Sequence, residues 1–308
     1  MAQVEVSLVI PAYNEAEVLE ECVVTSMEVL SECTSSYEII IVDDGSKDGT
    51  WNVVEKLHSE YPRVTGIRFT RNFGKESAIL AGLKKARGMA VVVMDADTQH
   101  PPQLIPRMIE VWRSAGIPVV EAVKEERCEE PIIRRLGALL FYSTFRIITG
   151  MDLKNSTDYK LLDRKVVEAY ISMPERCRFF RGLVQWLGYD RAVIHFTPGE
   201  RRKGTSAWSL RRLFSFALDS LVSFSALPLR VVYVLGIVVL LAAVVLGALT
   251  LYLKLTGKSA QGFPTVVILQ LFIGSSVMIS LGVIGEYIAR IYEEVKARPH
   301  YVVMKELE

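Results

Sequence analysis

The spacing of hydrophobic residues changes near residue 207. Before that point, short runs rich in Val and Ile alternate with amphipathic stretches, and Gly, Pro, Asp and Asn separate them. This pattern is typical of strands alternating with helices, in a mostly parallel sheet covered by helices on both faces. We therefore predict a Rossmann-like α/β domain over residues 1–206. The expected strands are 4–10, 37–42, 64–68, 91–94, 118–123, a short one after 158 and, as the last, 190–196; the expected helices include 76–85, 103–115 and 132–149.

The last third of the chain has the pattern of a membrane anchor. The uncharged apolar runs 231–253 and 263–285 are each long enough to cross a bilayer, and the short link between them predicts a transmembrane hairpin over 230–286. Residues 207–229 predict an amphipathic helix in the membrane interface. More basic residues flank the hairpin than lie in its link, so we predict an inner-membrane, multi-pass protein with both termini cytoplasmic, including the tail 287–308.

Composition narrows the classes of function. The net charge is +1, which offers no general attraction for nucleic acid. Half of the residues are hydrophobic, and the excess lies in the C-terminal third. The four cysteines have no C-x-x-C spacing and no signal peptide leads the chain, so we expect reduced, mostly buried thiols in a cytosolic domain.

Two carboxylates follow the apolar run 91–94 directly. Asp95 and Asp97 come at its end, and Pro101 and Pro102 then suit the first turn of a helix. Ligands of open α/β sheets bind beyond the carboxyl ends of the strands. Mg²⁺ prefers one or two carboxylates together with substrate phosphates. The pair therefore predicts a metal that joins the protein to a diphosphate, and a solvated turn is the alternative.

Two earlier strand ends carry residues suited to a nucleoside. Pro11, Tyr13 and Glu15 follow the first strand and could surround a base and ribose, or form only a turn in which Asn14 caps the next helix. Asp44 follows the second strand and could accept a hydrogen bond from a base or ribose, or belong to a capping cluster.

Charged residues near two further strands have a similar ambiguity. Arg71 and Lys75 lie just past the third strand, where they could bind a diphosphate or be solvated surface charges. Asp158 precedes a short strand amid small polar residues. It is a candidate acid/base or orienting carboxylate, and a turn residue is the alternative.

Taken together, these motifs resemble the family 2 glycosyltransferases. The motifs are SLVIPAYNE at 7–15, VDDGS at 42–46, RNFG at 71–74 and DADTQ at 95–99. The closer resemblance is to the dolichol-phosphate mannosyltransferase-like branch, and within it to bacterial polyprenyl-phosphate (bactoprenol) glycosyltransferases with a C-terminal two-helix hairpin. GEYIARIY at 285–292 is similar to the ending of that group.

The resemblance implies a GT-A fold, a nucleotide-sugar donor, Mg²⁺ or Mn²⁺, an undecaprenyl-type phosphate acceptor, inversion at the anomeric carbon, and a homo-oligomer, specifically a tetramer. A UDP-sugar is favoured, but UDP-glucose, UDP-N-acetylhexosamine, UDP-aminoarabinose-type donors and GDP-mannose stay open. By the same resemblance, Pro11, Tyr13, Glu15 and Asp44 meet the nucleoside, Asp95 and Asp97 bind nucleotide and metal, Gln99 lies near the sugar, Asp158 is the proposed base, and Arg201 belongs to the acceptor loop.

That loop departs from the family pattern. It reads RRKGTSAW at 201–208, with Ala207 at the usual Lys and Trp208 at the usual Tyr, so Arg202 and Lys203 are candidates to hold the acceptor phosphate with Arg201. A phosphate monoester is mostly dianionic at pH 7 and is already a nucleophile. We therefore hypothesise that Asp158 orients more than it deprotonates. The competing functions are a processive polysaccharide synthase and a membrane-anchored, non-catalytic nucleotide-sugar-binding scaffold.

Overall fold

The structure is a computed structural model that describes residues 4–97, 100–124, 156–176, 178–197, 227–256 and 262–308. The chain forms two compact units, residues 1–208 with 298–308, and residues 209–297. The helices expected at 132–149 and within 207–229 lie outside the described residues, apart from the last few positions of the second range.

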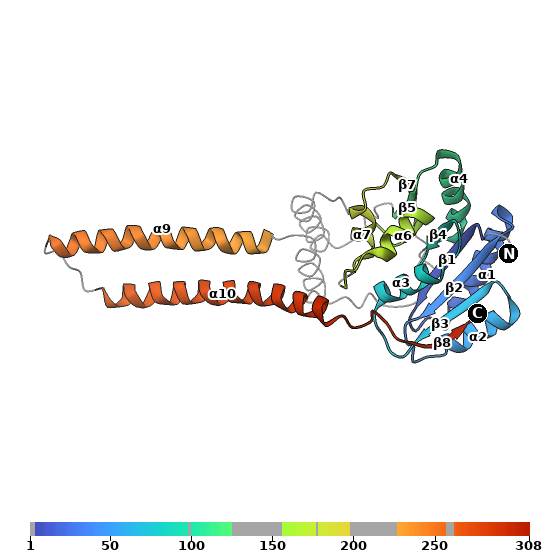
Figure 1. Cartoon of the computed structure of the whole chain (residues 1–308), viewed down its shortest axis with the longest axis horizontal. Coiled ribbons are helices and arrows are strands. Elements are labelled where there is room, and N and C mark those ends of the chain that lie inside the picture. The colour runs from blue at the N-terminus through green and yellow to red at the C-terminus, as the bar shows by residue number, and fades with distance from the viewer. Residues whose placement is uncertain (1–3, 98–99, 125–155, 177, 198–226, 257–261) are drawn as a thin grey trace. The chain divides into compact units, whose positions relative to one another are not determined.

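Among the described residues, eight strands form a mixed sheet at the centre of the first unit (Figure 1). Its order is β7-β5-β6-β4-β1-β2-β3-β8, with β1 to β4 mutually parallel and β6 antiparallel to both of its neighbours. The expected mostly parallel sheet is confirmed. The strands are β1 (Val6–Ala12), β2 (Tyr37–Asp43), β3 (Val64–Phe69), β4 (Ala90–Val93), β5 (Val119–Lys124), β6 (Lys160–Asp163), β7 (Arg191–Phe196) and β8 (Val303–Leu307).

The central strands are buried along their whole length. Every residue of β1, β2 and β4 is buried, as expected for parallel strands covered on both faces. The edge strand β8, which pairs antiparallel with β3, was not predicted, so the expectation that 190–196 is the last strand is wrong. Four of the five residues of β8 are exposed, and an edge strand of this kind has no buried apolar run to reveal it.

Helices cover both faces of the sheet. Helices α1, α2 and α4 pack on the face formed by Val6, Leu8 and Ile10, while α3 and α6 pack on the other. Gly82 lets α3 approach β1 closely, because a Cβ at this position would overlap the side chain of Val9. The helices are α1 (Leu19–Cys33), α2 (Thr50–Glu60), α3 (Lys75–Lys85), the 3₁₀ turn η1 (Pro102–Leu104), α4 (Ile105–Ala115), α6 (Arg164–Ser172) and α7 (Phe180–Trp186).

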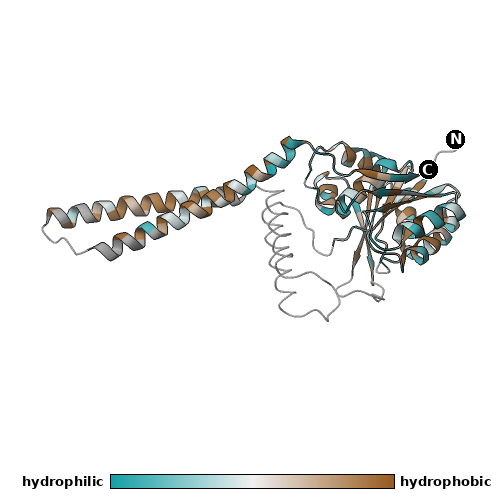
Figure 2. Cartoon of the chain, turned by 90° about the horizontal axis from the view of Figure 1, so that it is seen from below, coloured by the Kyte–Doolittle hydropathy of each residue, from teal (hydrophilic) through white to brown (hydrophobic). Residues whose placement is uncertain are grey.

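In the described part of the second unit, two long helices lie side by side (Figures 1 and 2). They are α9 (Leu227–Leu255) and α10 (Phe263–Lys296), and both extend beyond the apolar runs that predicted them. Each is long and apolar enough to cross a membrane. Apolar side chains such as Leu240 and Leu241 are more than half exposed along them, which is the surface that lipid would cover.

Candidate active site

One edge of the sheet collects the polar residues singled out in the sequence. The carboxyl ends of β1, β2, β3 and β4 share this edge because these strands are parallel. Strand β6 runs antiparallel to β4, with Lys160 opposite Val93, so the residues that precede β6 reach the same edge. Asp158 therefore arrives beside Asp95 although the two lie far apart in the chain.

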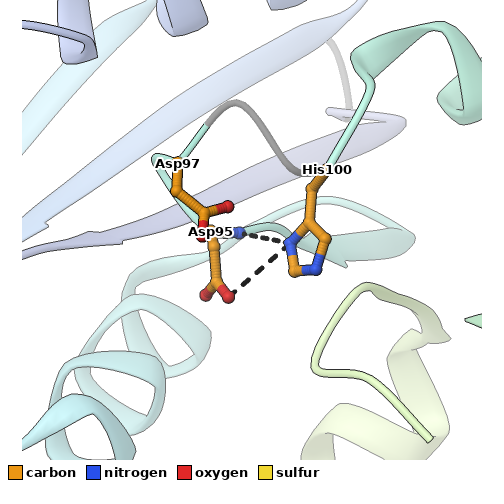
Figure 3. Close-up of side chains that lie close together, drawn as sticks. All are labelled: Asp95, Asp97 and His100. Atoms are coloured by element: carbon orange, nitrogen blue, oxygen red, sulfur yellow. Dashed lines mark hydrogen bonds and ion pairs between the residues drawn. The ribbon is translucent and has the colours of Figure 1, made fainter. Parts of the chain in front are cut away.

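Asp95, Asp97 and His100 form a group able to hold a metal ion (Figure 3). One ligand atom from each lies within 4.8 Å of the others. The main-chain N–H of Asp95 donates to Nδ1 of His100 at 3.2 Å, and the same ring nitrogen lies 3.6 Å from the Asp95 carboxylate. His100 is buried and its ring stacks on Tyr159 at 5.1 Å. The imidazole thus fixes the turn that carries both carboxylates.

Lys75, the first residue of α3, joins this group to Asp158. Its Nζ lies 2.5 Å from Oδ1 of Asp95 and 2.6 Å from Oδ2 of Asp158. On the other side of Asp158, Arg181 of α7 forms a two-pronged contact, with Nε 2.7 Å from Oδ1 and a second guanidinium nitrogen 3.0 Å from Oδ2. Arg181 also donates to the carbonyl of Ser156 at 2.9 Å. Asp158 is thereby clamped between two cations.

The clamp determines the charge of Asp158. Burial by itself would raise the pKa of this carboxyl, but Lys75 and Arg181 outweigh burial and hold its pKa far below the usual range. Burial would likewise lower the pKa of Lys75, but Asp95 and Asp158 outweigh it and raise that pKa. These side chains are therefore a carboxylate and an ammonium throughout the physiological pH range.

A second buried ion pair supports the segment before β6. Glu121 of β5 and Lys160 of β6 face each other in register, and their charged atoms lie 2.5 Å apart with both side chains almost wholly buried. The hydroxyl of Ser156 donates to the same Glu121 carboxylate, and the hydroxyl of Thr157 donates to the carbonyl of Ala122. The two residues that precede Asp158 are thus tied to β5.

Asp44 has a structural partner that sequence reasoning missed. Its two carboxylate oxygens accept the main-chain N–H groups of Phe73 at 2.7 Å and Gly74 at 2.9 Å. The turn after β2 also presses against the β3–α3 loop, because a Cβ on Gly45, whose φ is +68°, would overlap the main chain of Arg71. The guanidinium of Arg71 lies over the Phe73 ring at 4.2 Å. Asp44 therefore orders the loop that carries Arg71 and leads directly to Lys75 at the start of α3.

The turn after β1 packs against the turn after β2. Pro11 is buried at the end of β1, and Tyr13 is 42% exposed at the same edge.

Asn14 does not cap α1, which begins at Leu19. The φ of Asn14 is +56°, and its side-chain oxygen accepts the N–H of Lys47 at 3.0 Å. The N–H of Glu15 donates to the hydroxyl of Thr50 at 2.9 Å. The alternative in which Asn14 caps the next helix is wrong, because the Asn14 side-chain oxygen accepts the N–H of Lys47 in the turn after β2.

The structure therefore brings most of the expected residues to one edge of the sheet, and it joins Lys75, Asp95 and Asp158 directly. Gln99, Arg201, Arg202 and Lys203 lie outside the described residues. Arg181 and His100 were missed. His100 had a usable signal, since it lies three residues after Asp97 and before a proline, whereas Arg181 stands in an apolar helix with no motif around it.

The expectation of buried, reduced cysteines can be checked at Cys22 and Cys33, because Cys128 and Cys177 lie outside the described residues. Cys22 is buried behind the site, and burial, with Asp97 and Asp95, raises its pKa to about 12. Cys33 is only partly buried. Both are free thiols, and the high pKa of Cys22 makes it a poor metal ligand.

Comparison with known proteins decides the family. Residues 7–181 match the family described as glycosyl transferase family 2. This chain belongs to glycosyl transferase family 2. The resemblance drawn from the motifs is confirmed, and the sheet described above is the central sheet of a GT-A fold.

Relatives of this glycosyltransferase align with it over nearly their whole length. An uncharacterized glycosyltransferase of Synechocystis sp. is 40% identical over 302 residues, which are 97% of this chain and 95% of the relative. A bactoprenol glucosyl transferase of Shigella phage SfII is 37% identical over 303 residues, 98% of each protein. The crystal structure of glucosyl-3-phosphoglycerate synthase from Mycobacterium tuberculosis with Mn²⁺, UDP and phosphoglyceric acid has a TM-score of 0.49 and 20% identity, covering 72% of this chain and 78% of its own.

Proposed function

We propose that this glycosyltransferase moves a sugar from a nucleotide-sugar, most readily a UDP-sugar, to an undecaprenyl-type polyprenyl phosphate, with inversion at the anomeric carbon. The observation that carries the proposal is the group formed by Asp95, Asp97, Lys75 and Asp158 at the carboxyl edge of the sheet. The acceptor class is supported by relatives named bactoprenol glucosyl transferase that align over 98% of the chain. The two apolar helices agree with a lipid acceptor.

The two carboxylates suit a divalent metal. Asp95 and Asp97 offer hard oxygen ligands at one turn, which is the chemistry that Mg²⁺ and Mn²⁺ prefer. His100 is better suited to hold the turn, because its Nδ1 accepts the Asp95 N–H and a neutral ring then carries its proton on Nε2. A metal bound there would neutralise charge on the departing diphosphate. Lys75 places a further positive charge at the same point.

The donor and acceptor would lie on either side of Asp158. We assign the nucleoside to Pro11, Tyr13, Glu15 and Asp44, and the diphosphate to Arg71 and Lys75. The acceptor phosphate is mostly dianionic at pH 7 and needs little help from a base. Asp158, kept ionised by Lys75 and Arg181, then serves to hold these two cations in place. Arg201, Arg202 and Lys203 would bind the acceptor phosphate and Gln99 would lie near the sugar.

The membrane arrangement follows from the same proposal. A hairpin of α9 and α10 in the cytoplasmic membrane, preceded by an interfacial helix within 207–229, would keep residues 1–206 and the C-terminus in the cytoplasm, where nucleotide-sugars are found. The apolar surface of the hairpin also suits self-association, and a tetramer is the form we propose.

The test uses the purified full chain in detergent. It is incubated with undecaprenyl phosphate, Mn²⁺ or Mg²⁺ and each of UDP-glucose, UDP-N-acetylglucosamine, a UDP-aminoarabinose-type donor and GDP-mannose, and the lipid product is weighed by mass spectrometry. We expect one sugar added per lipid with one donor class, and loss of product with EDTA and in Asp97→Asn. Asp163→Asn is the matched control, since that carboxylate binds Trp112 and Lys165 at the other end of β6. A polymer, or no glycolipid with any donor, would contradict the proposal.

A further inference from the structure

The segment after α10 returns to the first unit and completes its sheet. Helix α10 ends at Lys296, and residues 298–308, here termed the C-terminal strap, belong to the same compact unit as the sheet. Strand β8 of the strap pairs antiparallel with β3, with Leu307 opposite Gly66 and Val303 opposite Phe69. Because β8 is antiparallel, it enters the sheet at the carboxyl edge of β3. The strap therefore starts at the edge that holds the active-site residues.

The strap contacts the end of β3 and the first residue of the loop that follows it. The N–H of Thr70 donates to the carbonyl of Val302 at 3.0 Å. The ring of Tyr301 stacks on Phe69, with centroids 4.8 Å apart and planes 13° apart. Phe69 is almost wholly buried and meets Phe73 edge-on at 5.8 Å. Tyr301 thus continues an aromatic stack that reaches into the 70–74 loop.

That loop carries the groups assigned to the donor. The N–H groups of Phe73 and Gly74 hold both oxygens of Asp44, Arg71 lies over the Phe73 ring, and Lys75 follows directly. A change in the position of Phe73 would therefore move the Asp44 contacts together with Arg71. The outer half of the strap is fastened separately, by Lys305 to Glu55 at 2.5 Å and by Glu306 to Lys85 at 2.6 Å.

We propose that the C-terminal strap is a positioning element for the donor nucleotide, in which Tyr301, through Phe69 and Phe73, holds the 70–74 loop in the form that binds the nucleoside diphosphate. Only residues 297–300 separate Tyr301 from the end of α10. The strap therefore ties donor binding to the chain segment that leaves the second candidate membrane helix. This inference rests on the proposed function and assigns Tyr301 a positioning role.

The experiment compares Tyr301→Ala with two matched variants of the full chain in detergent. Tyr301→Phe keeps the stacking ring, and Met304→Ala removes an apolar side chain that is 65% exposed on the same strap. Calorimetry measures the Kd of UDP and of GDP, each with Mn²⁺. Hydrogen exchange with mass spectrometry follows peptides that cover residues 70–76 and, as an internal reference, residues 88–96 on β4.

For Tyr301→Ala we expect a Kd about tenfold weaker for the nucleotide that the wild type binds. Exchange should be faster over residues 70–76 and unchanged over 88–96, and the KM for the lipid phosphate should stay within about twofold. Tyr301→Phe and Met304→Ala should match the wild type. Unchanged nucleotide binding in Tyr301→Ala would overturn the inference. Faster exchange over both peptides would also overturn it, because Tyr301 would then stabilise the whole domain rather than the 70–74 loop. If the wild type binds neither nucleotide, it is the proposed function that fails.

Discussion

The role of Asp158 can be tested by removing its charge while keeping its shape. In Asp158→Asn, Lys75 and Arg181 lose the carboxylate that lies between them, at 2.6 Å from Nζ and 2.7 Å from Nε. Lys75 retains its contact with Asp95. Arg181 retains the carbonyl of Ser156. We therefore expect Lys75 and Arg181 to stay near their positions but to be held less firmly.

The size of the effect follows from the contacts. A hydrogen bond to a charged group is worth about 1.5–3 kcal/mol, and the Asn oxygen can replace about one of the three contacts that Asp158 accepts. The side chains of Lys75 and Arg181 are 39% and 33% exposed, so solvent screening moves the estimate to the lower end. A net loss of about 2 kcal/mol corresponds to a kcat reduced roughly thirty-fold.

The pH dependence separates orientation from base catalysis. The pKa of Asp158 is depressed, so its contribution to stability is complete above the unfolded pKa, near 3.9, and is lost only as the pH falls through the folded value. Asp158 therefore stays ionised between about pH 5 and 9. We expect the kcat/KM profile of Asp158→Asn to keep the shape of the wild-type profile at a lower level.

The assay is glycolipid formation over that pH range, with the thermal unfolding of each variant recorded at the same pH. Asp163→Asn controls for loss of one carboxylate on β6 and should keep its kcat within about twofold, because Asp163 contacts neither Lys75 nor Arg181 in the described structure. An acidic limb present in the wild type and absent from Asp158→Asn would refute the reasoning, since Asp158 would then titrate as a base.

Two further predictions concern buried charges around the site. Burial, followed by the charge of Asp158, raises the pKa of Glu76 to about 8, so the folded state holds a proton that the unfolded chain has released and stability falls as the pH rises from about 5 to 8. Glu76→Gln should show a smaller fall in Tm between pH 5.5 and 8.5 than the wild type, and an equal fall would contradict this. Lys160→Met leaves Glu121 buried without its main cation and should lower the unfolding free energy by about 3 kcal/mol, whereas adding Glu121→Met should recover most of that loss. Denaturant titration measures the unfolding free energies of the Lys160→Met variant and of the double variant. A double variant no more stable than Lys160→Met would count against the ion pair between Glu121 and Lys160.

The sequence by itself determined where the buried parallel strands lie along the chain. The runs 39–42 and 91–94 are apolar at every position, which is typical of a strand buried on both faces, so β2 and β4 could be predicted from short-range pattern. The position of Asp95 and Asp97 beyond β4 followed from the same strand. The uncharged runs that became α9 and α10 were equally clear, because their length is a local property.

The tertiary structure alone decided which of these residues meet. Arg181 reaches Asp158 only because α7 comes to the amino end of β6, and Lys75 bridges Asp95 and Asp158 only because β6 inserts antiparallel beside β4. Likewise β8 joins β3 across more than two hundred residues of chain. Such contacts depend on the order and direction of strands, which hydrophobic periodicity does not encode, because the same alternation of apolar and polar residues is compatible with several strand orders.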